Sequence, residues 1–401
     1  MNKNRKTLLA GSALAVGSFL MTSPLSAAFP IVLGNDDLGE LTIGGAIRAN
    51  YTVGDYNNSP SSEGTSAYRG GSGAVTLDTF RINLDYENGP WSAKGEYRFY
   101  PVDGNTSYHF LHTAWIGYDL DTGDQVQVGL NRTPFGAGPY GTSQSWFFDQ
   151  HYYVGLADNM NVGIKYIHNQ VENWTIDFAA YVMSAPSGTG TNSEASRYSY
   201  DVVNASGGEG YRERGQVNVR AVTDVQFGEV ESAIGGSAQY GILAGRGGLS
   251  DEDMFALAIH AVNQWEGWNL TGQLSYYEYS TDGNSVEMGA YNFTTPVADK
   301  AWVPAVSLSY FYEADQIDWL DSITPYVEYS SVIKTESGWN DSEMAVIGAA
   351  FATGGWYTYV DLAFSNGNDF IGNRDTNFDQ YAQNSNQSWM TRFNINFGYY
   401  F

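Results

Sequence analysis

The sequence contains no cysteine, which excludes a disulfide framework. Positive charge is also scarce: 19 Lys and Arg stand against 44 Asp and Glu, and the net charge of −25 excludes a sequence-wide nucleic-acid footprint. The five histidines show no His-x-x-x-His metal spacing, and the chain has neither a Gly-x-Ser-x-Gly elbow nor a Walker loop. The residues therefore predict no catalytic group, no metal and no cofactor, in a protein that is not an enzyme.

Long apolar runs are missing as well, except at the start of the chain. Basic residues and an apolar run to about Met21 come first, and the small residues Ser26-Ala27-Ala28 follow. This pattern predicts a secretory signal peptide over residues 1–28, cleaved after Ala28 or Ala27, and a single domain over residues 29–401. No later stretch approaches the roughly 18 apolar residues of a transmembrane helix, so an exported chain could still cross a membrane only as a closed barrel.

The chain is rich in Gly (46), Tyr (30), Phe (20) and Trp (11). In its last segment, 388–401, Phe393, Ile395 and Phe397 alternate with polar residues, as in a strand with one apolar face and one polar face. The chain ends at Phe401, which resembles the C-terminal aromatic signature of bacterial outer-membrane proteins. The resemblance implies that the barrel-assembly machinery recognises Phe401.

The same alternation recurs along the whole chain, with no linker composition between segments. It predicts sixteen strands, an even number as in single-chain bacterial barrels. The predicted strands are 41–53, 80–86, 91–99, 110–120, 124–131, 160–168, 174–183, 215–227, 229–241, 253–263, 268–279, 301–312, 322–333, 344–352, 356–366 and 388–401. The predicted fold is therefore all-β: a transmembrane antiparallel β-barrel of about 16 strands.

The connections between these strands alternate in length. Short turns follow the even-numbered strands, and long loops follow most of the odd-numbered ones, for example 57–73, 184–213, 280–299 and 367–387. Short periplasmic turns and long extracellular loops are typical of outer-membrane barrels. Four tryptophans lie just beyond short turns and predict an interfacial girdle: Trp91, Trp174, Trp268 and Trp356.

The connection between the fifth and sixth strands has an unusual composition. Nearly thirty residues long, it carries a cluster of aromatic side chains that needs a surface to bury against, while its Pro and Gly residues allow tight reversals. We predict an inward-folded third extracellular loop that constricts the barrel. The alternative is a surface or trimer-contact loop. The predicted constriction-loop residues are Pro134, Phe135, Gly136, Trp146, Phe147, Phe148 and Asp149.

Basic residues gather in the polar phase of four strands that become consecutive when the barrel closes, and such a wall would set a field across the pore. The predicted pore-lining and constriction residues are Arg48, Arg81, Lys94, Glu96, Arg98, Arg132, Arg220 and Arg392. The net acidity favours cations and the basic wall favours anions. The residues leave this selectivity open.

Four stretches resemble porins of the phosphate-selective O/P superfamily: 76–99, 113–120, 125–136 and 161–166. Members typically place Gly-x-x-Lys-x-Pro-Phe-Gly at this strand end. Here residues 129–136 read Gly-Leu-Asn-Arg-Thr-Pro-Phe-Gly, with Arg132 keeping the positive charge. The resemblance covers the first half of the chain best, and the lumenal Arg and Lys ladders of phosphate-selective members do not map onto this chain. It implies a sixteen-stranded homotrimer whose third loop narrows the pore.

These observations predict an outer-membrane porin for passive diffusion of ions and small hydrophilic solutes. The alternatives are a solute-specific porin, for phosphate, another anion or a carbohydrate, and a structural or adhesive barrel. Expected partners are outer-membrane lipid and lipopolysaccharide, the latter near the acidic and amide-rich loop 367–387.

Overall fold

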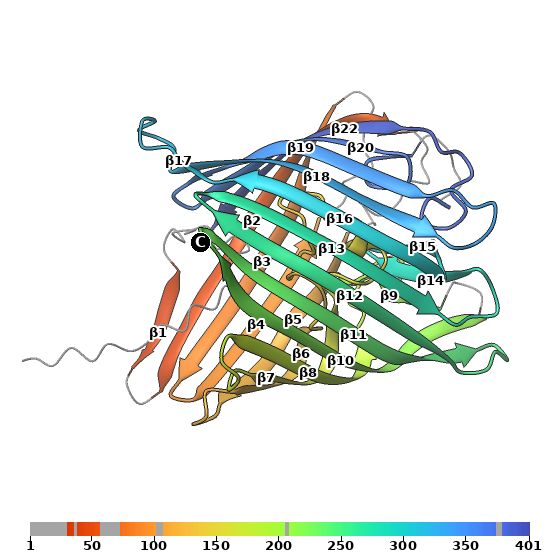
Figure 1. Cartoon of the computed structure of the whole chain (residues 1–401), viewed down its shortest axis with the longest axis horizontal. Helices are drawn as coiled ribbons and strands as arrows, with labels where there is room; N and C mark the ends of the chain where they lie inside the picture. The colour runs from red at the N-terminus through yellow and green to blue at the C-terminus, as the bar shows by residue number, and fades with distance from the viewer. Residues whose placement is uncertain (1–29, 36–37, 57–72, 102–106, 205–207, 374–378) are drawn as a thin grey trace, which may run out of the picture.

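The computed structural model describes residues 30–35, 38–56, 73–101, 107–204, 208–373 and 379–401. The predicted signal peptide, 1–28, and most of the loop 57–73 lie outside the described residues. Sixteen antiparallel strands form a closed barrel, so this prediction is confirmed (Figure 1). They are β2 (Gly39–Tyr56), β3 (Ala74–Asn88), β4 (Trp91–Tyr100), β5 (Tyr108–Asp119), β6 (Gln125–Arg132), β7 (Met160–His168), β8 (Trp174–Ser184), β10 (Gly210–Phe227), β11 (Val230–Arg246), β12 (Glu252–Trp265), β13 (Trp268–Tyr279), β16 (Lys300–Tyr310), β18 (Ser322–Lys334), β19 (Ser342–Thr353), β20 (Trp356–Ser365) and β22 (Met390–Tyr400).

The barrel closes where the last strand meets the first. β22 pairs with β2 from Ala46 opposite Tyr400 to Gly54 opposite Arg392. Beyond this ladder, the main chains of Gly45 and Phe401 exchange two hydrogen bonds of 2.8 and 3.0 Å. A Cβ on Gly45 would clash with the Arg81 carbonyl and the Phe401 ring, so this approach requires glycine. Closure gives every barrel strand a paired neighbour on each side.

The two faces of the strands differ in polarity, as the alternation predicts. On β12, for example, Leu257 and Ile259 are exposed, whereas Ala256, Ala258 and His260 are buried. The same pattern places large apolar side chains on the outer surface and the polar phase in the interior of the barrel. No helix among the described residues is long and apolar enough to span a bilayer.

The four predicted girdle tryptophans are all exposed at the short-turn end of the barrel. Three of them pack against a tyrosine of the neighbouring strand: the ring centroids are 4.7 Å apart for Trp91 and Tyr118, 4.8 Å for Trp268 and Tyr310, and 4.9 Å for Trp356 and Tyr399. Trp174 begins β8 at the same end. Amphipathic rings in these positions are typical of a barrel's membrane interface.

Several elements lie outside the barrel ladder. β9 (Asp201–Val202), β14 (Ser285–Ala290) and β15 (Phe293–Ala298) form a three-stranded sheet within two connections for which the sequence predicts only loops. β1 (Ile31–Asn35) and β21 (Gly372–Asn373) pair with the two ends of β2. β17 (Tyr312–Glu313) pairs with β18, and α1 (Gln150–Tyr153) is a single helical turn. Some barrel strands also begin earlier than predicted: β3 at Ala74 and β10 at Gly210.

Candidate functional site: an arginine wall and the segment 133–159

Four arginines of the polar phase form a group that we call the arginine wall: Arg48, Arg81, Arg98 and Arg132. They come from β2, β3, β4 and β6, and Arg81 lies directly opposite Arg98 in the β3–β4 ladder. Glu96 is 3.7 Å from Arg81 and also accepts a short hydrogen bond from Arg98. Glu96 therefore forms ion pairs with both Arg81 and Arg98.

The counter-charge of Arg48 is placed by a β-bulge. In the β2–β3 ladder Arg48 faces Thr79 and Ala49 faces Leu77, so Asp78 is the extra residue. As a result Asp78 and Thr79 both turn to the interior, where Arg48 contacts them at 3.1 and 2.8 Å. A bulge re-aims a side chain in this way.

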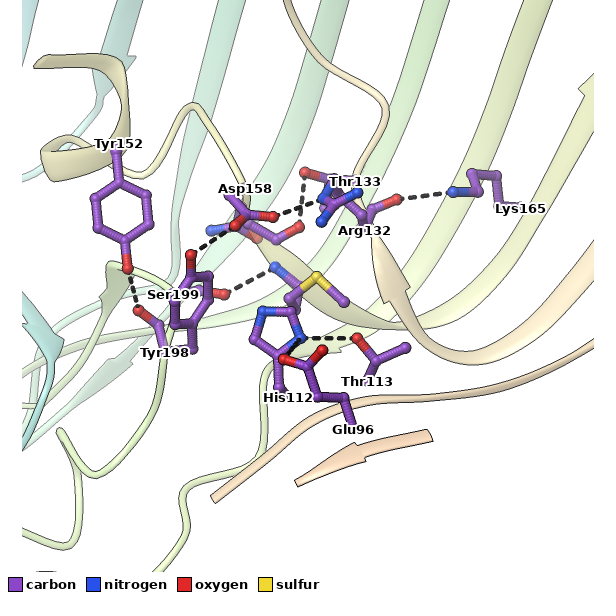
Figure 2. A network of polar contacts seen from close by, with 12 residues as sticks. Glu96, His112, Thr113, Arg132, Thr133, Tyr152, Asp158, Lys165, Tyr198 and Ser199 are labelled. Atoms are coloured by element: carbon purple, nitrogen blue, oxygen red, sulfur yellow. Dashed lines mark hydrogen bonds and ion pairs between the residues drawn. The ribbon is translucent and has the colours of Figure 1, made fainter. Parts of the chain in front are cut away.

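A second bulge, on β5, adds a histidine beside the wall. Glu96 faces Thr113 and Tyr97 faces Leu111, which leaves His112 as the extra residue. The buried His112 lies 3.5 Å from Glu96, and its Nδ1 is 2.8 Å from the Thr113 hydroxyl (Figure 2). Two breaks in the strand register thus supply both an acid and an imidazole to this quadrant.

The last arginine of the wall is paired with a loop residue. Arg132 Nε donates to Asp158 at 2.6 Å, and its guanidinium lies 5.8 Å from the centroid of the Tyr140 ring. With Asp78, Glu96 and Asp158 as its carboxyl partners, the arginine wall carries four positive charges against three negative ones. Among these seven groups a single positive charge is in excess, and the Lys165 ammonium donates to the Arg132 carbonyl at 3.1 Å beside them.

The segment 133–159 joins β6 to β7 and contacts interior-facing side chains of distant strands. The main-chain nitrogens of Gly136, Ala137, Trp146 and Gln150 donate to side chains of four different strands. The acceptors are Ser237 on β11 at 3.0 Å, Gln273 on β13 at 2.7 Å, Asp361 on β20 at 3.3 Å and Ser330 on β18 at 3.1 Å. The segment therefore bonds to strands that lie four to eight positions away from β6 around the barrel.

Glu328 on β18 binds this segment through four hydrogen bonds. Its carboxyl oxygens accept hydrogen bonds from the hydroxyls of Ser143 and Ser145, both at 2.9 Å, and from Ser145 N at 3.0 Å. A fourth, short hydrogen bond comes from Gln144 N. Because four donors converge on one buried carboxyl group, Glu328 is the main anchor of the segment.

Two of the predicted pore-lining arginines lie under this segment rather than in the arginine wall. The fully buried Arg392 donates to the Phe370 carbonyl at 2.6 Å, and its guanidinium lies about 5 Å from the ring centroids of Trp146 (5.1 Å) and Phe147 (5.0 Å). Arg220 donates to the Gly136 carbonyl at 2.8 Å. Both side chains hold the segment in place.

Lys94 and the predicted constriction-loop residues lie outside the arginine wall. Lys94 is 2.7 Å from Asp85, and both side chains are about half exposed, near the short-turn end of β4. Of the predicted constriction-loop residues, some are buried and others half-buried. The buried ones are Pro134, Phe135, Gly136, Phe147 and Asp149, and the half-buried ones are Trp146 and Phe148. Phe135 and Phe147 are thus shielded from solvent, and Trp146 and Phe148 are partly shielded.

Asp149 organises the segment internally. It caps α1 by accepting from His151 N at 2.9 Å, and it also accepts from Thr142 N at 2.5 Å and the Thr142 hydroxyl at 2.8 Å. Burial raises the pKa of Asp149, but the charge of His151 and these hydrogen bonds outweigh it, so the pKa lies below its ordinary value of 3.8. The ionised form is therefore the one that the fold of the segment favours.

This depressed pKa predicts that acid loosens the segment. The stabilisation by Asp149 is fully present above its ordinary pKa of 3.8 and is lost as the pH falls through the lower folded value. In Asp149→Ala, which can neither ionise nor cap α1, the segment is expected to be looser at neutral pH by about 0.5–2 kcal/mol, and the acid transition is expected to disappear. Proteolysis of the segment as a function of pH measures both. An unchanged acid transition in the variant would contradict the assignment.

Sequence reasoning missed Asp78, His112, Asp158 and Tyr198, all of which contact the arginine wall. The sequence does contain a signal for Asp78. In the run 76–80, Thr-Leu-Asp-Thr-Phe, two consecutive polar residues interrupt the alternation, as a bulge requires. Asp158 and Tyr198 lie in connections, where no periodicity exists to place them.

The fold is that of the outer-membrane channels. The structure is similar to the outer-membrane channel DcaP of Acinetobacter baumannii (TM-score 0.59, 10% identity, 92% of this chain and 99% of that chain). It is also similar to Salmonella typhi OmpF in complex with daunomycin (TM-score 0.57, 12% identity, 92% and 100%) and to an anion-selective porin from Comamonas acidovorans (TM-score 0.50, 11% identity, 90% and 99%). No protein-family model and no curated protein matches the chain. At these identities the likeness establishes the fold.

The described residues offer no metal centre. Within these ranges, no three His, Asp or Glu side chains are grouped so that they could hold a metal ion. The polar chemistry of the interior consists instead of paired arginines, carboxyl groups and amides. Such groups can bind and orient hydrated ions and polar solutes.

Proposed function

We propose that the protein is an outer-membrane porin, a water-filled channel for passive diffusion of ions and small hydrophilic solutes. The closed sixteen-stranded barrel with an apolar outer face and a polar interior carries this proposal. A barrel of this strand number has room for an aqueous lumen. Similarity of fold to DcaP, OmpF and the anion-selective porin supports it.

The segment 133–159 is proposed as the third extracellular loop, folded inward to narrow the pore beside the arginine wall. Its hydrogen bonds to β11, β13, β18 and β20 support this role. Solutes would pass between the segment and Arg48 and Arg81, whose side chains are 18% and 19% exposed. In this arrangement the arginines set the local field, because charges farther away than about 8 Å are screened at physiological salt.

The cellular setting follows from the same proposal. Residues 1–28 would direct export and be removed, the short turns would face the periplasm, and the long loops would contact lipopolysaccharide. A homotrimer, recognition of Phe401 by the barrel-assembly machinery and membership of the phosphate-selective O/P superfamily belong to the proposal as well. The superfamily assignment rests on residues 129–136 and the neighbouring strands. Mass measurement in detergent tests the trimer.

An anion-preferring porin is the second candidate, and the single excess positive charge of the arginine wall favours it over a carbohydrate pore. A structural or adhesive barrel, which would not conduct, is the alternative outside the transport proteins. Purified protein in planar bilayers separates these possibilities. A porin gives stepwise, ohmic conductance in KCl, and swelling of liposomes in small sugars reports uncharged solutes. A barrel that inserts without any conductance would overturn the proposed function.

A further inference from the structure

A second connection also reaches the arginine wall. The residues 185–203 follow β8, and Thr189 forms a two-way main-chain bridge with His109 of β5, with hydrogen bonds of 2.9 and 3.0 Å. From this connection Tyr198 extends to the wall, where its ring centroid lies 4.3 Å from the Arg98 guanidinium carbon and 4.4 Å from the His112 ring. Tyr198 is only 2% exposed, so the contact excludes water from that face of Arg98.

The hydroxyl of the same tyrosine acts on a second arginine through its counter-ion. It donates to Asp158 Oδ2 at 2.6 Å, while the other oxygen of Asp158 accepts from Arg132 at 2.6 Å (Figure 2). Burial, and then the negative charge of Asp158, raise the pKa of Tyr198 well above its ordinary value. The hydroxyl therefore keeps its proton and remains a donor to Asp158.

Tyr198 is held in this position from two sides. Its carbonyl accepts from the Tyr152 hydroxyl at 2.8 Å, which links it to the segment 133–159. The next residue, Ser199, accepts from Met160 N at 2.8 Å, and Arg197 pairs with Asp201 at 3.0 Å. These bonds fix the tyrosine between two connections, so it is part of the wall rather than a mobile side chain of the mouth.

The four side chains of the arginine wall differ in how much of their surface is exposed. The Arg98 side chain is 8% exposed, against 18% for Arg48 and 19% for Arg81. Arg132 is more open, at 37%, but its charge is matched by the Asp158 carboxylate that Tyr198 holds. Arg98 is therefore the most covered arginine of the wall, and Arg132, the most open one, is paired with the carboxylate that Tyr198 holds.

We propose that Tyr198 is a specificity-determining residue of the pore: its ring covers Arg98 and its hydroxyl fixes Asp158 against Arg132, which limits how strongly the arginine wall attracts anions. This inference rests on the proposed channel function. The selectivity of the pore is then set by a residue of the connection 185–203 in addition to the segment 133–159. Sequence alternation cannot identify such a residue, because the connection has no period.

Reversal potentials in a KCl gradient test the proposal with three variants. Tyr198→Ala uncovers Arg98 and is expected to raise the chloride-to-potassium permeability ratio by about two- to fivefold, the range that corresponds to one lost cation–π contact. Tyr198→Phe keeps the ring and is expected to give a smaller shift. Tyr166→Phe is the matched control, because it removes another Tyr–Asp hydrogen bond, from Tyr166 to Asp124 at 2.7 Å, away from the wall.

A labelling experiment needs no change at Tyr198 and so covers the case in which Tyr198→Ala does not fold. The chain has no cysteine of its own, so single cysteines at Arg48→Cys and Arg98→Cys report only those positions. A negatively charged thiol reagent is expected to block current quickly at position 48 and slowly at position 98.

The outcomes separate this inference from the proposed function. Equal labelling rates, or a Tyr198→Ala permeability ratio equal to that of the wild type in conducting channels, would overturn the role of Tyr198 and leave the channel standing. Absence of conductance in the wild-type protein would overturn the channel, and the inference with it.

Discussion

Glu328→Ala is expected to release the segment 133–159 from the barrel wall and to enlarge the pore. The substitution removes the shared acceptor of four donors, from Ser143, Gln144 and Ser145, and the two serine hydroxyls keep another acceptor in the Phe147 carbonyl. A buried donor left unsatisfied costs about 1–3 kcal/mol, so the attachment of the segment to β18 is expected to weaken by at least about that amount. Single-channel conductance should rise and become noisier, and liposomes should swell faster in larger sugars.

A matched control is Glu278→Ala. Glu278 faces outward near the long-loop end of β13 and pairs with Lys300 at 2.9 Å, a partly exposed ion pair worth about 0–1 kcal/mol. Its conductance should equal that of the wild type. If Glu328→Ala folds and conducts as the wild type does, the segment does not limit the pore.

Arg48→Ala combined with Arg81→Ala is expected to turn the selectivity toward cations. The arginine wall changes from four positive and three negative charges to two and three, so one excess positive charge becomes one excess negative charge. A unit charge about 8 Å from an ion in water contributes about 0.5 kcal/mol. Two charges together give about 1 kcal/mol, or about fivefold in the permeability ratio.

The reversal potential in a KCl gradient measures this change, and dilute salt enlarges it because screening weakens. Arg214→Ala is the control, since Arg214 is 57% exposed at the long-loop end and pairs there with Asp251. Arg214→Ala should leave the ratio near that of the wild type. A double variant with an unshifted reversal potential would remove Arg48 and Arg81 from the pore lining.

Most of the barrel could be predicted from the sequence because each strand carries its own alternating pattern of apolar and polar residues. Each strand must show lipid one face and water the other, so the period of two appears in the residues themselves, as at Phe393, Ile395 and Phe397. The predicted boundaries were wrong where alternation breaks. The start of β3 was missed because the bulge at Asp78 shifts the phase, and β14 and β15 were missed because they pair with each other and with β9 rather than with the barrel.

The site could be predicted only in part, for the same physical reason. The alternation within each strand assigns Arg48, Arg81 and Arg98 to the interior face. Their strands are neighbours because strand order follows chain order in an antiparallel barrel. Partners from connections are brought in by long-range contacts: Asp158 comes from the segment 133–159 and Tyr198 from the next long connection. Arg392 has the polar phase too, but whether a solute or a loop covers it depends on how Trp146 and Phe147 pack.

The bonds from Gly136, Ala137, Trp146 and Gln150 to strands far from β6 have a mechanical consequence. A hollow cylinder under sideways pressure flattens most easily when nothing connects its opposing sides. Here the segment 133–159 connects β6 to distant strands through the barrel interior and resists such flattening. Changes in bilayer tension should therefore deform the cross-section of Glu328→Ala more than that of the wild type.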